Sequence, residues 1–272
     1  MYWNLLLISF VTALVLTAIG FKNYVWFLSI GYGLAVAGIG IVLVILGLAG
    51  TLHLSSGLVV MCLLLVIYGC RLSGFLIYRE AKNAAYRKTL AEAAKDTSGG
   101  KAMPVFVKAA IWISVSLLYA AQTAPVLYRG VAEHANGLWI IGGLIALSGI
   151  LLESAADHQK SAFKKIDPHA PAMKGLYKIV RCPNYLGEII FWTGVFISGW
   201  PVLTGAGQWL LCLAGYICIV WVMFNSAKRL ETRQNRNYGN REDYRNYAEH
   251  TPILIPFIPL YHLVKEVKYG KE

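Results

Sequence analysis

Apolar and polar positions alternate along this chain in long blocks. Windows of about twenty apolar residues, the length that crosses roughly 30 Å of hydrocarbon as a helix, occur seven times. The pattern predicts an all-α fold, a polytopic membrane protein with a seven-transmembrane helix bundle. The expected spans lie near residues 3–21, 25–50, 57–78, 104–126, 137–155, 185–203 and 206–226.

The composition agrees with this pattern. Hydrophobic residues make up 57% of the chain and charged residues 14%, and the mean hydropathy is +0.54, which excludes an ordinary soluble domain. The first window lacks a basic n-region and a clear cleavage site, so we interpret it as a span and not as a signal peptide. We treat residues 1–272 as a single membrane domain.

Charge predicts the orientation. Most Lys and Arg residues lie at Lys22, in the 79–101 and 160–181 loops, and after Lys228, and seven spans place these regions on one side. The positive-inside rule then puts the N-terminus outside and the C-terminus in the cytoplasm. The membrane would be the inner membrane of a bacterium or the endoplasmic reticulum of a eukaryote. The net charge of +11 reflects this asymmetry, so we expect no nucleic-acid partner.

Two kinds of cofactor site are not predicted. The five cysteines include no CxxC pair, and no His/Cys cluster has zinc spacing, so we expect no metal. Neither GxGxxG after a strand nor GxxxxGK[ST] occurs, which argues against a Rossmann or P-loop fold.

The most informative polar motif is Arg-Cys-Pro-Asn-Tyr-Leu-Gly-Glu at 181–188. Pro183 suits the first turn of a helix, where no N–H donor is needed. Asn184 and Glu188 are four residues apart and share one helix face. A carboxylate one turn inside a membrane segment is costly unless it is paired or binds a ligand. The motif therefore predicts a functional site, with structural capping as the alternative.

Two further polar segments share the predicted cytoplasmic side. Glu153, Asp157, Lys160 and Lys164 follow the spacing of one helix face, either as an ion-pair ladder or as a site where the lysines bind phosphates and Asp157 a sugar or amide. Residues 228–247 mix basic residues with tyrosines, which suits a flat anionic ligand or a lipid surface.

The 181–188 motif, with Trp192 four residues on, resembles the C-terminal signature of the steroid 5α-reductase family. Gln-Lys-x-x-Phe-Lys at 159–164 and the Tyr-Gly…Tyr…Ile-Pro ending are similar to the related sterol C14 and Δ7 reductases. The resemblance implies that residues 1–130 contribute the substrate cavity and that 137–260 bind NADPH from the cytosol. The implied cofactor contacts are Asp157, Lys160, Lys164, Arg181, Asn184, Tyr185, Glu188, Arg229, Arg233 and Tyr238.

The chemistry implied by the resemblance is reduction of a carbon–carbon double bond conjugated to a ketone, as in a 3-oxo-Δ4 steroid. Tyr68-x-x-Arg71 resembles the family's Tyr-x-x-Arg, which makes Tyr68 the candidate donor to the carbonyl oxygen. A phenol keeps its proton at neutral pH and can stabilise the developing enolate. The alternative is an ordinary interior tyrosine bonded to a backbone carbonyl.

One departure from the family matters for the substrate. The steroid reductases pair this tyrosine with a glutamate of the second span, whereas residues 23–56 contain no Asp or Glu. Ser29, Tyr32 or a water would take that place, or the substrate is another unsaturated lipid.

A second enzyme class shares part of the pattern. The isoprenylcysteine methyltransferases, which bind S-adenosylmethionine, have a similar Arg-x-Pro-x-Tyr-x-Gly motif and tail. They usually carry a His after the Arg and a Glu-Glu pair in the last helix, where this chain has Cys182 and Glu231-Thr232. A membrane packing or sensor protein without catalysis is a third interpretation. The sequence specifies neither the natural substrate nor an oligomeric state.

Overall fold

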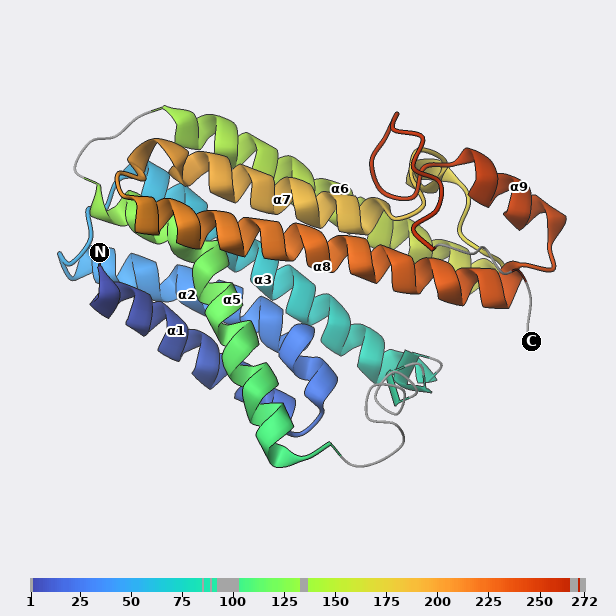
Figure 1. The fold of residues 1–272 in the computed structure, drawn as a ribbon, viewed down its shortest axis with the longest axis horizontal. Coiled ribbons are helices and arrows are strands. Elements are labelled where there is room, and N and C mark those ends of the chain that lie inside the picture. Colours follow the sequence, from blue (N-terminus) through green and yellow to red (C-terminus); the bar gives the residue numbers. More distant parts are fainter. Residues whose placement is uncertain are drawn as a thin grey trace. The chain divides into compact units, whose positions relative to one another are not determined.

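The computed structural model describes residues 2–84, 86–88, 90–91, 103–132, 137–264 and 269, and every regular element among them is a helix (Figure 1). The α-helices are α1 (Trp3–Thr17), α2 (Ile30–Leu48), α3 (Ser56–Lys82), α5 (Val105–Val131), α6 (Leu138–Ile166), α7 (Pro183–Gly199), α8 (Ala206–Tyr238) and α9 (Glu242–His250). The short 3-10 helices are η1 (Ala18–Phe21), η2 (Tyr24–Leu28), η3 (Gly175–Lys178) and η4 (Trp200–Val202).

Six of the described helices are long and apolar enough to cross a membrane: α1 with η1, α2, α3, α5, α6 and α8. The chain is therefore a polytopic all-α membrane protein, as predicted. The predicted count of seven is not confirmed, because α7 has 17 residues, fewer than the roughly 20 that a span usually needs.

Several helix boundaries match the sequence pattern and one does not. α7 begins at Pro183 and α8 ends just before Gly239, as the proline and glycine signals predict. The second apolar window is not one helix, because η2 precedes α2 and Ser29 between them has φ −125° and ψ −95°. Asn23 caps η2 by accepting a hydrogen bond from the Val25 N–H at 3.2 Å, which starts a separate element there.

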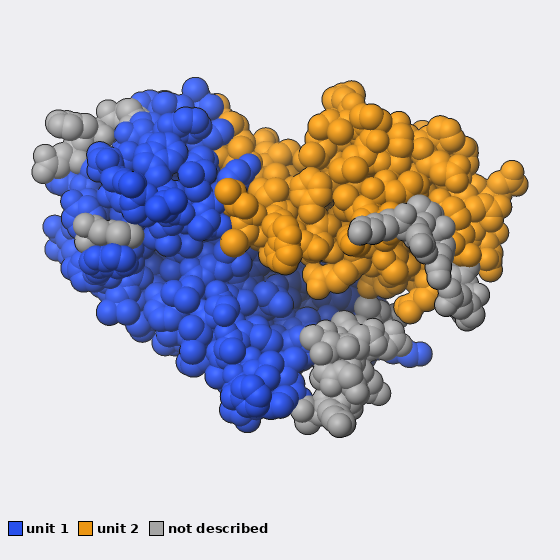
Figure 2. Space-filling view, in the orientation of Figure 1, with its two compact units in different colours: residues 1–143, 195–216 blue, residues 144–194, 217–272 orange. Residues whose placement is uncertain are grey.

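The chain divides into two compact units, which Figure 2 colours separately. Unit 1 comprises residues 1–143 and 195–216, and unit 2 comprises 144–194 and 217–272. Unit 1 holds α1, α2, α3 and α5, whereas unit 2 holds most of α6 and α7, the second part of α8, and α9.

Glycines allow close helix contacts within each unit. In unit 1, a Cβ at Gly33 of α2 would lie 2.6 Å from the Gly69 carbonyl of α3, so the two backbones touch. In unit 2, a Cβ at Gly149 of α6 would lie 2.6 Å from the Gly187 carbonyl of α7. Small residues permit such approach between membrane helices, where packing replaces the hydrophobic effect as the driving force.

Candidate functional site

The predicted cofactor contacts all fall in unit 2, and Tyr68 falls in unit 1. The ten cofactor candidates come from the C-terminal part of α6, the start of α7 and Arg181 two residues before it, and the C-terminal part of α8. The structure thus gathers them on three helix ends of one compact unit.

Lys164 joins α6 to α8. Its Nζ donates to the Tyr238 hydroxyl at 2.8 Å and to the carbonyls of Pro168 and Ala170 at 2.9 and 2.7 Å. Two predicted contacts, Lys164 and Tyr238, are therefore adjacent. Asp157 and Lys160 are half-buried on the same helix.

The start of α7 is rich in buried polar atoms. Asn184 Oδ1 is buried and has no hydrogen-bond partner among the described residues. Glu188 is only 7% exposed, and Tyr185 is half-buried. A Cβ at Gly187 would lie 2.7 Å from the backbone nitrogen of Glu153, a second carboxylate that is 4% exposed. Sequence reasoning placed Glu153 in the charged ladder but missed it as a buried group at this helix crossing.

Arg181 has a partner that the sequence did not reveal. Its side chain is 1% exposed, and its Nη2 lies 2.9 Å from Glu231 Oε1 of α8 and also donates to the Tyr261 carbonyl. Its Nε and Nη1 are buried and make no hydrogen bond of good geometry in the described part of the chain, and the Tyr244 hydroxyl lies close enough to interact with the guanidinium. The Arg181 and Cys182 N–H groups donate to the carbonyls of Pro252 and Ile253. Arg181 therefore holds the 251–264 segment against the start of α7.

Glu231 is the other half of this connection. It is fully buried. Its Oε1 lies 2.8 Å from His262 Nδ1, and its Oε2 accepts from the N–H groups of Leu263 and Val264 at 2.9 and 3.2 Å. Burial by itself would raise the pKa of this carboxyl, but the hydrogen bonds from Arg181, Leu263 and His262 lower it below its ordinary value. The group is therefore a carboxylate at neutral pH.

The tail tyrosines beyond Tyr238 form part of the unit 2 core. Tyr244 is fully buried and donates to Asn235 Oδ1 at 2.6 Å, and Tyr247 donates to the Tyr177 carbonyl at 2.6 Å. Burial raises the pKa of Tyr177, Tyr244 and Tyr247. Arg229 and Arg233, one turn apart on α8, are exposed to solvent.

Tyr68 lies in a cluster of buried tyrosines in unit 1. Its hydroxyl is 3.2 Å from the Tyr32 hydroxyl of α2, and the two side chains are 0% and 5% exposed. The Tyr119 ring of α5 lies 4.9 Å from the Tyr32 ring, centroid to centroid. Of the three groups expected in place of the family's glutamate, Tyr32 is the one whose hydroxyl meets Tyr68, whereas the Ser29 hydroxyl donates to the Val25 carbonyl at 2.9 Å.

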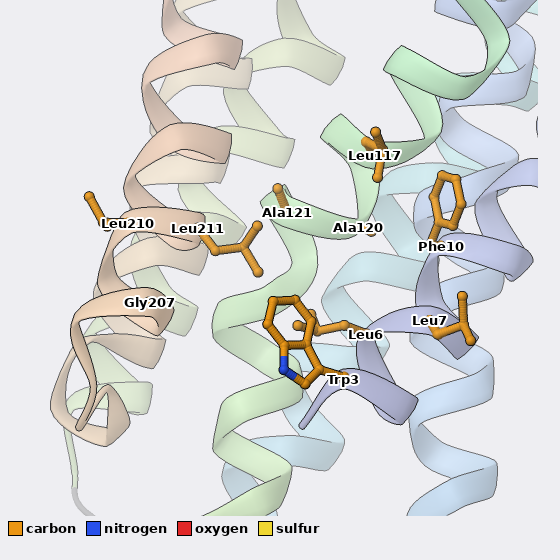
Figure 3. A pocket seen from close by; sticks show the side chains of 10 residues that line it. All are labelled: Trp3, Leu6, Leu7, Phe10, Leu117, Ala120, Ala121, Gly207, Leu210 and Leu211. Carbon is orange, nitrogen blue, oxygen red and sulfur yellow. The ribbon is translucent and has the colours of Figure 1, made fainter. Parts of the chain in front are cut away.

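Unit 1 also contains an apolar cavity of about 740 Å³ between α1, α5 and the start of α8 (Figure 3). Tyr119 directly precedes two of its lining alanines on α5. The cavity is lined by Trp3, Leu6, Leu7, Phe10, Leu117, Ala120, Ala121, Gly207, Leu210 and Leu211. Its walls suit an apolar ligand.

Together these features define a polytopic helical membrane protein with polar groups gathered on three helix ends of one unit and buried phenols among the helices of the other. A family model described as "Protein of unknown function (DUF1295)" matches residues 21–251, and the chain belongs to this family. The 3-oxo-5-alpha-steroid 4-dehydrogenase 1 of Bos taurus is 21% identical over 172 residues, which cover 59% of this chain and 59% of that protein. These matches confirm the resemblance to the steroid 5α-reductase family. No solved structure matches the chain.

Proposed function

We propose that this protein is a membrane-embedded, NADPH-dependent reductase of a carbon–carbon double bond conjugated to a ketone, acting on a steroid or another unsaturated lipid. One observation supports the proposal beyond the family match: the ten candidate contacts all lie in unit 2, in the C-terminal parts of α6 and α8 and around the start of α7. The bovine relative, a 3-oxo-5-alpha-steroid 4-dehydrogenase, supports this reaction class and not methyl transfer.

The proposal includes a seventh span. The 17 residues of α7 measure about 26 Å at 1.5 Å per residue, and η4 adds three more residues, enough for a short crossing. Seven spans put the N-terminus outside and the polar ends of α6 and α8 in the cytoplasm, in a bacterial inner membrane or an endoplasmic reticulum. Residues 1–130 then contribute the substrate cavity, and 137–260 bind the cofactor.

The unit 2 residues fit an anionic dinucleotide. Arg181 Nε and Nη1 are buried donors, and Asn184 Oδ1 a buried acceptor, that make no hydrogen bond of good geometry among the described residues. Such atoms are normally satisfied by a ligand or an ordered water. A phosphate oxygen suits the guanidinium donors, and an amide or amino group of the cofactor suits the Asn184 oxygen. The exposed Arg229 and Arg233 and the half-buried Lys160 would meet the 2′-phosphate.

When bound, NADPH supplies a hydride to the β-carbon of the enone. Tyr68 would donate a hydrogen bond to the carbonyl oxygen, where negative charge develops as the double-bond electrons shift and an enolate forms. The enolate then takes a proton from water at its α-carbon, which restores the ketone. Lys164 and Tyr238 hold α6 against α8, and this fixes the cofactor-binding ends relative to each other.

Cofactor binding in detergent tests the proposal. We expect NADPH to bind at least about tenfold more tightly than NADH, the size of one or more charge-assisted hydrogen bonds. Arg233→Ala should narrow this difference, because Arg233 is exposed and meets the 2′-phosphate. Arg241→Ala removes another exposed arginine of unit 2, one paired with Asp243, and should leave the difference unchanged. Equal affinity for NADPH and NADH with tighter binding of S-adenosylmethionine would contradict the proposal.

A further inference from the structure

The two buried hydroxyls of Tyr32 and Tyr68 form a contact between spans that are far apart in sequence. Their oxygens are 3.2 Å apart across 36 positions of the chain. Their rings meet edge to face, with centroids 6.1 Å apart and planes at 72°. A hydroxyl-to-hydroxyl contact in a membrane helix bundle uses one phenol as donor and the other as acceptor.

The surrounding structure fixes both rings. The Tyr119 ring lies over Tyr32 at an interplanar angle of 31°, and the Tyr119 hydroxyl donates to the Phe27 carbonyl at 2.9 Å. Gly33 and Gly69, the residues that follow Tyr32 and Tyr68, bring the backbones of α2 and α3 into contact. The Ser73 hydroxyl donates to the Ile30 carbonyl at 2.8 Å across the same pair of helices. The two phenols therefore have little freedom to separate.

We propose that Tyr32 is a positioning residue that donates a hydrogen bond to the Tyr68 oxygen, so that the Tyr68 O–H in turn donates to the substrate carbonyl. This relay rests on the proposed reductase function. Both groups are phenols, so the relay is neutral throughout. A neutral pair avoids a buried carboxylate at membrane depth, which would be costly.

The direction of the hydrogen bond follows from the chemistry. If Tyr68 donated to Tyr32, its proton would be occupied and could not reach the substrate oxygen. When Tyr68 accepts from Tyr32, its own O–H is polarised, because successive hydrogen bonds strengthen one another. The relay becomes stronger as negative charge develops on the carbonyl oxygen, so it stabilises the transition state more than the bound ketone. The ligand it suits is a neutral carbonyl oxygen.

Steady-state reduction of a 3-oxo-Δ4 steroid at saturating NADPH tests the relay. Tyr32→Phe should lower kcat by about tenfold, as expected for one hydrogen bond of a relay, and leave KM and NADPH affinity within about twofold. Tyr128→Phe is the matched control. It removes a buried hydroxyl in the same unit that has no hydrogen-bond partner in the described residues, and it should leave kcat unchanged.

Enone absorption gives a readout that does not depend on turnover. The bound steroid, without reductant, should absorb at longer wavelength in the wild type because its carbonyl is polarised. This shift should shrink in Tyr32→Phe and vanish in Tyr68→Phe. Replacing Tyr32 with 3-fluorotyrosine, a more acidic phenol of nearly the same size, should raise kcat, since it donates more strongly.

The outcomes separate the two proposals. A Tyr32→Phe variant with wild-type or higher kcat and an unchanged absorption shift would overturn the relay and leave the reductase function standing. A wild type that neither shifts the absorption of the enone nor reduces it would overturn both. A lower kcat with a smaller shift, together with an unaffected Tyr128→Phe, would support the relay.

Discussion

At the scale of single residues, Arg181 shows how a predicted ligand contact can also be a structural group. Its side chain is almost fully buried and pairs with Glu231, 50 positions along the chain. Glu231 in turn binds the backbone of Leu263 and Val264. Removing one partner of a buried pair leaves the other charge uncompensated, which costs far more than loss of an exposed pair. We expect this pair to decide whether the 251–264 segment stays in place.

Glu231→Gln should lower the free energy of unfolding of the purified protein by about 3–5 kcal/mol at neutral pH, as for other broken buried pairs. The effect should depend on pH. Because folding lowers the pKa of Glu231 below its ordinary value of 4.5, its carboxylate stabilises the fold above that value, and this stabilisation is lost as the pH falls through the folded pKa. Thermal unfolding in detergent between pH 3 and pH 7 would show the gap between wild type and variant closing towards acid.

The control for this variant is an exposed pair in the same unit. Arg241 and Asp243 are 2.8 Å apart, but their side chains are 44% and 51% exposed. Asp243→Asn should change the melting temperature little, because water screens such a pair. Equal effects of the two substitutions would show that the Arg181–Glu231 pair does not hold the fold.

At the scale of elements, glycines decide how closely helices approach. Gly69 and Gly74 lie on the same helix, α3, yet their surroundings differ. A Cβ at Gly69 would lie 2.7 Å from the Ala37 nitrogen and 2.9 Å from the Ala37 Cβ of α2. A Cβ at Gly74 would meet nothing within 4 Å.

These two positions provide a matched pair of alanine substitutions. Gly69→Ala should lower the free energy of unfolding by about 1–3 kcal/mol, because the backbone atoms of α2 that the new Cβ would meet cannot move aside cheaply. It should also impair the proposed catalytic role of Tyr68, the residue before it. Gly74→Ala should stabilise the protein by about 0.5–1 kcal/mol through the higher helix propensity of alanine. Melting temperatures in the same detergent would test both signs. A tolerated Gly69→Ala would mean that α2 and α3 are packed less tightly than the glycine contact requires.

At the scale of the whole molecule, the open question of membrane topology reduces to α7. If this 17-residue helix crosses the membrane, the termini lie on opposite sides; with the other six helices alone, they lie on the same side. His169 before α7 and the Thr204 turn after it are both exposed, so the sides on which they lie distinguish the two alternatives.

Single cysteines at these two positions, in a background without the native cysteines, make the test direct. We expect a membrane-impermeant maleimide to label Thr204→Cys in intact cells or sealed vesicles of native orientation, and to label His169→Cys only after permeabilisation. The expectation follows from the basic residues at the ends of α6 and α8. If His169→Cys and Thr204→Cys are labelled under the same condition, α7 does not cross.

Much of the fold was determined by local properties of the sequence. Long apolar windows predicted the positions of the helices, because a segment in a membrane must satisfy its backbone hydrogen bonds internally. Pro183 and Gly239 marked helix boundaries, since proline and glycine act on the backbone next to them. The family signature at 181–188 could likewise be recognised from the sequence, because its residues are consecutive in the chain.

The pairings between distant residues were decided only by the tertiary structure. The sequence named Tyr32 as one of several alternatives for the place of the family's glutamate, and only the packing of α2 on α3 shows that its hydroxyl contacts Tyr68. Likewise, nothing in the sequence connected Glu231 to Arg181 or His262. The break at Ser29 also departed from the continuous apolar window. Hydropathy and spacing describe a segment with its neighbours in sequence, whereas these contacts depend on which helices cross, at which glycines, and with which side chains facing inward.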